Sequence, residues 1–237
     1  MSPRITLTQS NRYTWRIFAA VWLAIFAGVL WWSSNAAHDR ALKQITEQAR
    51  IDAHLNIALL RAFLDKQRTL PLVLSMDPEL KTTLQTPLPE LTQPLNLKLE
   101  ALAQGAQAAV IYLLSNDGKG IAASNWHSPD SFVGTDYAFR PYFSQAMENG
   151  HAEYFAFGNV SNRPGLYISR RIDGDNGPLG VIVVKLSFDQ LENDWRNTGR
   201  TTFVVGEQDT VLITSRADWR FHSLGQLSPD ALKRIQD

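Results

Sequence analysis

Hydrophobic and polar positions divide the chain into three successive patterns. Residues 17–37 form a run of 21 positions without a charged side chain, and about 20 apolar residues are enough for a helix to cross a membrane. In residues 38–70, apolar side chains recur every three or four positions without a glycine or proline, which predicts one long helix. After Ala108, short apolar runs alternate with glycine-containing turns, which predicts β-strands.

The apolar run predicts a transmembrane helix over 17–37, with residues 1–16 in the cytoplasm. Three arginines and no acidic residue precede it, and positive residues favour the cytoplasmic side of a membrane. The alternative is a cleaved signal peptide, because residues 34–36 offer a small-residue cleavage site. The length of the run and the tryptophans that end it favour the anchor. Under both interpretations, everything after Ala37 is exported.

The helix over 38–70 continues directly from the membrane segment and predicts a stalk. Such a stalk could pair with a second copy of the chain, or pack on its own domain. Residues 77–94 contain four prolines, which predicts a loop. Residues 95–104 predict a second, shorter helix.

The remaining pattern predicts an α+β domain with an antiparallel sheet. Its elements are a hairpin at 110–124, a helix from Pro141 to Gly150, strands at 166–172 and 180–186, and a helix from Ser187 to Gly199. Gln190, three residues after Ser187, completes a capping-box pattern. A second hairpin at 203–215 repeats the first, which predicts the start of a second unit. We therefore expect a membrane-distal domain over 71–200, an incomplete membrane-proximal one over 201–237, and a chain that is a fragment or a truncated reading frame.

Composition excludes several kinds of chemistry. The formal net charge is zero, which argues against a nucleic-acid binder. The sequence has no cysteine, and therefore no disulfide, thiol nucleophile or cysteine zinc site. His127, His151 and His222 are scattered without metal-binding spacing, and no nucleophile motif occurs, which disfavours an exported hydrolase or metal enzyme. We expect neither a cofactor nor a metal ion.

Three stretches carry the candidate chemistry. Arg140 lies among four aromatic residues and a proline in Tyr137–Phe143, and Lys185 interrupts an apolar run over 181–186. A polar turn rich in hydrogen-bond donors occupies 158–165 between them. A guanidinium binds a carboxylate through two hydrogen bonds, and a lysine in an apolar strand needs an anion nearby. Two such cations suit a small dicarboxylate, although each one alone would more often form a surface ion pair.

These stretches, in this order, resemble double Cache or tandem-PAS sensor domains. The resemblance covers 133–143, 158–169 and 179–185, and it is closest to the C4-dicarboxylate-sensing histidine kinases that control dicarboxylate uptake. It extends from the membrane segment to Asp237, including Trp195 and the pair Trp219-Arg220.

The resemblance implies a set of ligand-binding residues, a fold and a location. The implied ligand contacts are Tyr137, Arg140, Asn159, Ser161 and Lys185, with Tyr142, Tyr167 and Ser169 as pocket walls. Asn159 departs from the family, which usually has a small hydroxyl residue there. The implied ligand is succinate, fumarate or malate, and the domains over 71–200 and 201–237 would be PAS-like. The family also implies a homodimer through the stalk, a bacterial inner-membrane location with the sensor in the periplasm, and a kinase module that this chain lacks.

Two other functions remain open from the sequence. A Cache-type sensor of an amino acid or another carboxylate could serve a chemotaxis or cyclic-dinucleotide output. It would need an aspartate for the ammonium group, for which Asp136 and Asp189 are candidates. The second alternative function is a stalk or dimerisation segment that senses no ligand.

Overall fold

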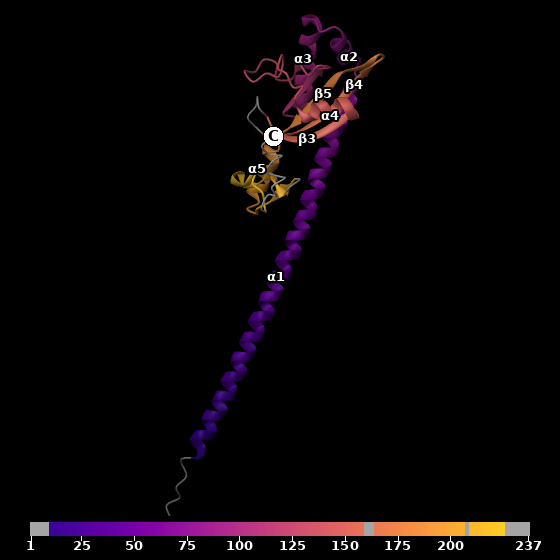
Figure 1. Cartoon of the computed structure of the whole chain (residues 1–237). Helices are drawn as coiled ribbons and strands as arrows, with labels where there is room; N and C mark the ends of the chain where they lie inside the picture. Colours follow the sequence, from indigo (N-terminus) through magenta and orange to yellow (C-terminus); the bar gives the residue numbers. More distant parts are fainter. Residues whose placement is uncertain (1–9, 159–163, 207–208, 226–237) are drawn as a thin grey trace, which may run out of the picture. The chain divides into compact units, whose positions relative to one another are not determined.

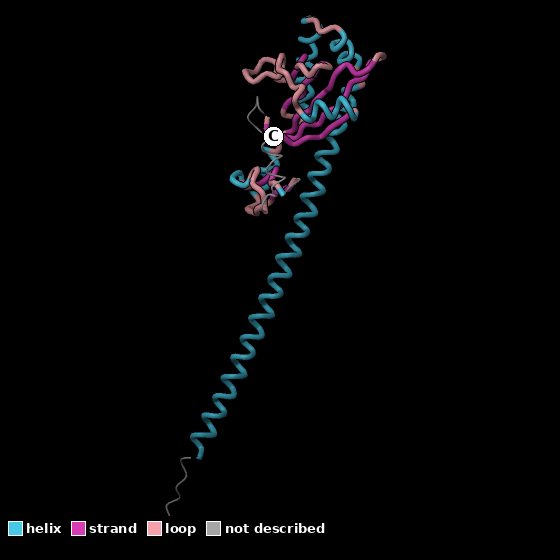
Figure 2. Tube along the Cα trace, viewed as in Figure 1, coloured by secondary structure: helices cyan, strands magenta, loops and turns pink. Residues whose placement is uncertain are grey.

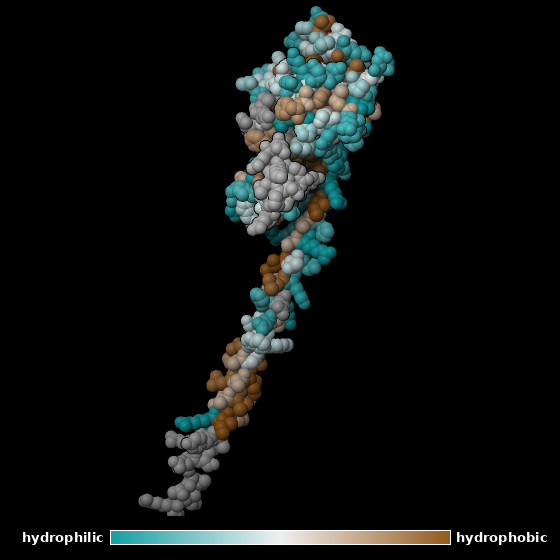
Figure 3. Space-filling model, in the orientation of Figure 1, coloured by the Kyte–Doolittle hydropathy of each residue, from teal (hydrophilic) through white to brown (hydrophobic). Residues whose placement is uncertain are grey.

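The computed structural model describes residues 10–158, 164–206 and 209–225. The chain forms two compact units, Met1–Phe63 and Leu64–Asp237. The described part of the first unit is helical throughout and belongs to α1 (Ser10–Ser75). Apolar side chains in its first half are exposed, including Ile17, Trp22 and Trp32 (Figure 3). By length and composition, this helix is able to cross a membrane.

The second unit contains a five-stranded antiparallel sheet (Figures 1 and 2). Its strands are β1 (Val110–Ser115), β2 (Gly120–Ala123), β3 (His151–Phe157), β4 (Pro164–Gly174) and β5 (Gly177–Leu186). They lie in the order β2-β1-β5-β4-β3, which places β1 and β5 side by side although they are far apart in sequence. The α+β class with an antiparallel sheet is as predicted.

Alternating side chains give the sheet two buried faces. Tyr112, Val181 and Val183 lie in one core cluster with residues of α4 (Pro141–Asn149). Their neighbours in the strands point to the other face, because successive side chains in a strand alternate. Among these neighbours, Ile111 and Ile182 are fully buried, and α2 (Pro78–Gln85) and α3 (Pro89–Ala106) contact the same strands.

The predicted loop over 77–94 is wrong, since α2 and the start of α3 occupy it. Pro78 and Pro89 each stand at the first position of a helix, where no backbone N–H is needed. Asp77 caps α2 by accepting a hydrogen bond from the Glu79 backbone N–H. Pro94 removes one hydrogen bond inside α3, but the next residue, Leu95, is fully buried and holds the helix to the sheet. Pro71 likewise lies within α1, so the helix predicted to end at residue 70 runs on to Ser75.

Strand β3 was not predicted from the sequence. It pairs with β4 through residues 151–157, and most of its side chains are at least partly exposed. An edge strand of this kind lacks the apolar alternation by which strands are recognised. The predicted capping box is also absent: α5 (Asp189–Asn197) starts after Phe188, and the Ser187 hydroxyl donates to the Asp189 carboxylate instead.

The second predicted hairpin is present as β6 (Phe203–Val205) and β7 (Val211–Thr214), followed by the short 3-10 helix η2 (Ala217–Trp219). Helix α5 connects to it through Glu192, which is buried. The Glu192 carboxylate accepts hydrogen bonds from the Thr214 backbone N–H and from the Arg220 guanidinium. This partly buried ion pair connects the hairpin region to the helix that precedes it.

Candidate functional site

The turn between β1 and β2 positions the segment that carries Tyr137 and Arg140. The Tyr137 backbone N–H donates to the Gly118 carbonyl at 2.9 Å, and Lys119 forms a β-bridge with Asp136. Gly118 has φ +88°, and a Cβ there would lie 2.6 Å from the Ala138 nitrogen. Only glycine therefore allows the turn to approach this segment so closely.

Arg140 is the residue immediately before α4, and its carbonyl accepts hydrogen bonds from the first turn of that helix. One Nη donates to the Phe157 carbonyl at 3.4 Å, a long bond, and the guanidinium lies 5.1 Å from the Phe139 ring centroid. Its Nε is shielded from solvent and has no hydrogen-bond partner among the described residues. This unused N–H donor suits a carboxylate, which a guanidinium binds through two hydrogen bonds.

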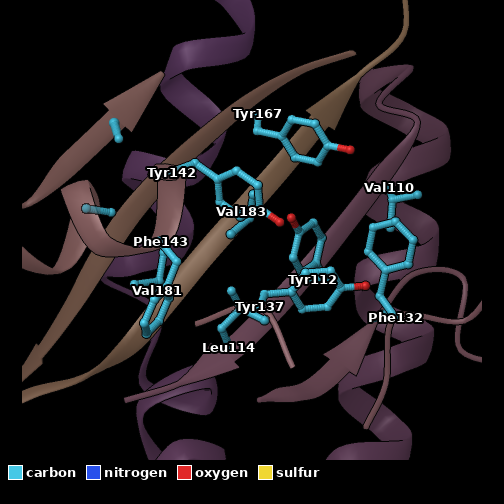
Figure 4. Close-up of a cluster of buried hydrophobic side chains, with 13 residues drawn as sticks. Val110, Tyr112, Leu114, Phe132, Tyr137, Tyr142, Phe143, Tyr167, Val181 and Val183 are labelled. Atoms are coloured by element: carbon cyan, nitrogen blue, oxygen red, sulfur yellow. The ribbon is translucent and has the colours of Figure 1, made fainter. Parts of the chain in front are cut away.

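Four buried tyrosines, Tyr112, Tyr137, Tyr142 and Tyr167, lie together in the core cluster (Figure 4). Tyr112 contacts Tyr137 and Tyr142, with ring centroids 5.5 and 6.5 Å apart, and Tyr142 stacks on Tyr167. Burial raises the pKa of Tyr137 and Tyr167 to about 12, and the nearby Arg140 charge opposes this rise. Burial also raises the pKa of Tyr112 and Tyr142. All four hydroxyls are therefore neutral at physiological pH and are able to donate hydrogen bonds.

Lys185 lies on β5 next to these rings. It pairs in register with Tyr167 on β4 and Val110 on β1, and only 2% of its surface is exposed. Its Nζ lies 5.4 Å from the Tyr167 ring centroid, a cation–π distance. Gly165 packs on the lysine stem, since a Cβ there would lie 3.1 Å from the Lys185 Cε. The sequence thus places a buried cation directly against the tyrosine wall.

Ser169 is buried, and its hydroxyl binds backbone carbonyl groups. Its hydroxyl contacts the carbonyl oxygens of Tyr142 at 2.8 Å and Ala152 at 3.2 Å. Because Ser169 belongs to β4, Tyr142 to α4 and Ala152 to β3, this hydroxyl connects the three elements. Ser169 therefore supports the wall and does not supply a free donor.

The structure brings together most of the residues singled out from the sequence. Tyr137, Arg140, Tyr142, Tyr167 and Lys185 lie in or against one cluster. Asn159 and Ser161 lie outside the described residues. Tyr112 was missed by sequence reasoning, although its place in the apolar alternation of 110–114 could have indicated an inward-facing ring.

Comparison with known proteins gives the family. No family model matches the chain. The chain is 33% identical to the sensor domain of the histidine kinase DctB of V. cholerae, with a TM-score of 0.72, over 80% of this chain and 73% of that structure. The chain belongs to the DctB sensor family.

Two curated proteins extend the DctB match along nearly the whole chain. Both are named C4-dicarboxylate transport sensor protein DctB. The chain is 49% identical to that of Rhizobium meliloti over 98% of its length, and 33% identical to that of Pseudomonas aeruginosa over 95%. It spans 37% and 38% of the length of these DctB proteins. The family expected from the sequence and the Cache/PAS-like fold are therefore confirmed.

Proposed function

We propose that this chain is the extracytoplasmic sensor part of a two-component sensor histidine kinase that controls C4-dicarboxylate transport. The ligand would be succinate, fumarate or malate. One observation carries the proposal: two cations lie near one stacked ring pair. Burial raises the pKa of Tyr142 and Tyr167 and the nearby Arg140 charge opposes this rise, while Lys185 Nζ lies 5.4 Å from the Tyr167 ring centroid. A molecule with a carboxylate at each end matches two cations that lie close to neutral hydroxyl donors.

The residues have distinct roles in this proposal. Arg140 binds one carboxylate through its guanidinium, including the shielded Nε. Lys185 binds the other as a point charge, since its ammonium group is held in a buried strand. Tyr137 contributes a neutral hydroxyl, and Tyr142 and Tyr167 form the wall. Asn159 and Ser161, which lie outside the described residues, would supply further hydrogen bonds.

Signalling is proposed to pass through α1 of a homodimer in the bacterial inner membrane, with the sensor in the periplasm. Leu42, Ile45, Leu55 and Leu59 are each more than half exposed on this helix. Apolar residues at such spacing favour pairing of two helices. The sequence has no cysteine, so Leu59→Cys gives a unique crosslinking site. Rapid disulfide formation between copies in membranes is expected for Leu59→Cys, whereas Arg61→Cys, which lies on a different face of the helix, should crosslink more slowly.

Binding is tested on the full chain in nanodiscs by titration calorimetry and thermal unfolding. Succinate, fumarate and malate are compared with butyrate, which has the length of succinate but only one carboxylate, and with aspartate. Ligand at 100 times its Kd should stabilise the fold by about 2.7 kcal/mol. Arg140→Ala should abolish this effect, and Arg170→Ala, at a half-buried arginine on β4, serves as the matched control. Stabilisation by aspartate alone would favour the amino-acid sensor instead.

A further inference from the structure

We propose that the edge strand β3 transmits ligand binding from Arg140 to α1, so that Glu153 and Phe157 are the positioning residues of the sensor. The inference rests on the proposed function and extends it to the regulation of the same site. Strand β3 is paired only with β4 within the described part of the chain. Its free edge leaves it able to shift without breaking the centre of the sheet, where β1 and β5 lie.

The first contact connects β3 to the ligand site. The Arg140 guanidinium donates to the carbonyl of Phe157, the last residue of β3, at 3.4 Å. This bond is long for an N–H···O hydrogen bond and therefore weak. A ligand carboxylate offers the remaining donors of the guanidinium, including Nε, a charged acceptor, which forms a stronger bond. Ligand capture by Arg140 thus orders the guanidinium and, with it, the contact that β3 makes through its backbone.

The second contact connects β3 to α1. The Glu153 carboxylate accepts from Nε and Nη2 of Arg68 at 2.6 and 2.8 Å, and Arg68 also pairs with Asp65 on its own helix. These hydrogen bonds, that to Glu153 first, raise the Arg68 pKa. Two parallel bonds fix the orientation of the helix turn against the strand. Because Arg68 and Glu153 are 45% and 34% exposed, the pair adds little to folding stability, and removing it should leave the fold intact.

The third contact connects β3 to the C-terminal segment. The rings of Phe155 and Phe157 lie 6.4 and 6.3 Å from the ring of Phe221, which follows η2. Phe155 also contacts Phe188 at the start of α5, at 6.1 Å. A shift of β3 therefore reaches both α1 and the second hairpin. The seven-residue strand β3 thus contacts the candidate site, α1 and the C-terminal segment.

The test is hydrogen exchange of the full chain in nanodiscs, read in the peptides covering 64–75 and 151–157, with saturation by succinate confirmed by calorimetry. In the parent chain, succinate should slow exchange in both peptides, by about threefold or more. In Glu153→Gln, succinate should still bind and protect 151–157, but protection of 64–75 should be lost. Asp218→Asn, which removes the exposed Arg216–Asp218 pair, is the matched control and should behave as the parent.

A ligand-free arm separates this inference from the proposed function. Arg140→Ala removes the contact to Phe157 and should speed exchange in 151–157 and in 64–75. In the double variant with Glu153→Gln, Arg140→Ala should speed exchange in 151–157 alone. If exchange in 64–75 still responds to succinate or to Arg140→Ala when Glu153 is replaced by Gln, the proposed role of β3 is wrong. Failure of every dicarboxylate to bind the parent overturns the proposed function, and the ligand-free arm then decides the coupling by itself.

Discussion

The rings of Tyr142 and Tyr167 stack face to face, with centroids 4.7 Å apart and planes within 4°. Tyr142 belongs to α4 and Tyr167 to β4, so this pair connects the helix after Arg140 to the strand beside Lys185. The stacked pair, which forms the wall of the proposed pocket, therefore links α4 to β4. Ring contacts of this kind contribute about 0.5–1.5 kcal/mol beyond burial.

The stack of Tyr142 on Tyr167 predicts different outcomes for two substitutions of Tyr167. Tyr167→Leu removes the stack and the cation–π contact with Lys185, and should lower the free energy of unfolding by about 1–3 kcal/mol. Tyr167→Phe keeps both contacts and should cost less than about 1 kcal/mol. Urea unfolding monitored by circular dichroism measures the two values. Equal losses of unfolding free energy in the two variants would mean that the Tyr167 hydroxyl, and not its ring, provides the stabilisation.

Alkaline pH should destabilise the domain in a defined window. The pKa of Tyr137 and Tyr167 is about 12 in the folded chain against 10 for an ordinary tyrosine. Below pH 10 neither state loses these protons, so stability is unaffected. Between pH 10 and 12 only the unfolded chain releases them, so the free energy of unfolding should fall, by about 2–3 kcal/mol for each group. Chemical denaturation from pH 9 to 12 measures the fall, and Tyr167→Phe should reduce it.

Lys185 should be needed for binding more than for folding. Lys185→Met keeps an unbranched side chain of similar length and removes the charge. Loss of a charged hydrogen bond is worth about 1.5–3 kcal/mol, so succinate affinity should fall by about 10- to 100-fold. Titration calorimetry gives the affinity, and circular dichroism confirms the fold. Lys119→Met, on the β1–β2 turn, is the control, and an unchanged Kd in Lys185→Met would remove this lysine from the site.

Gly118 should affect the site without touching a ligand. Gly118→Ala puts a Cβ against the backbone of Ala138 at 2.6 Å and requires a positive φ, so it should cost about 1–3 kcal/mol of stability and weaken succinate binding. Gly134→Ala shares the positive φ, at +79°, but meets nothing within 4 Å. Thermal unfolding and calorimetry of both variants separate backbone strain from the clash. Matching losses in the two variants would refute the role of the close approach.

The sequence predicted the apolar helix, both hairpins and α4, because each carries a local signal. The Tyr137–Phe143 run and the lysine inside an apolar strand were visible in the same way. Strand β3 was not, since an exposed edge strand is defined by its pairing with β4 and has no periodicity of its own. The helices at 78–85 and 89–106 were hidden by prolines at positions that tolerate them. Arg68–Glu153 joins residues far apart in sequence, and only the fold reveals it.

The sheet order has a consequence for how the domain is made. Val110 pairs with Lys185, so β1 stays without its partner β5 until the chain has been synthesised as far as Leu186. Contacts this distant along the chain slow folding, because the loop between them must be closed first. The proposed pocket is then among the last features to form. A ligand of the proposed pocket would bind only the completed sheet, and would therefore stabilise a newly made chain only at the end of folding.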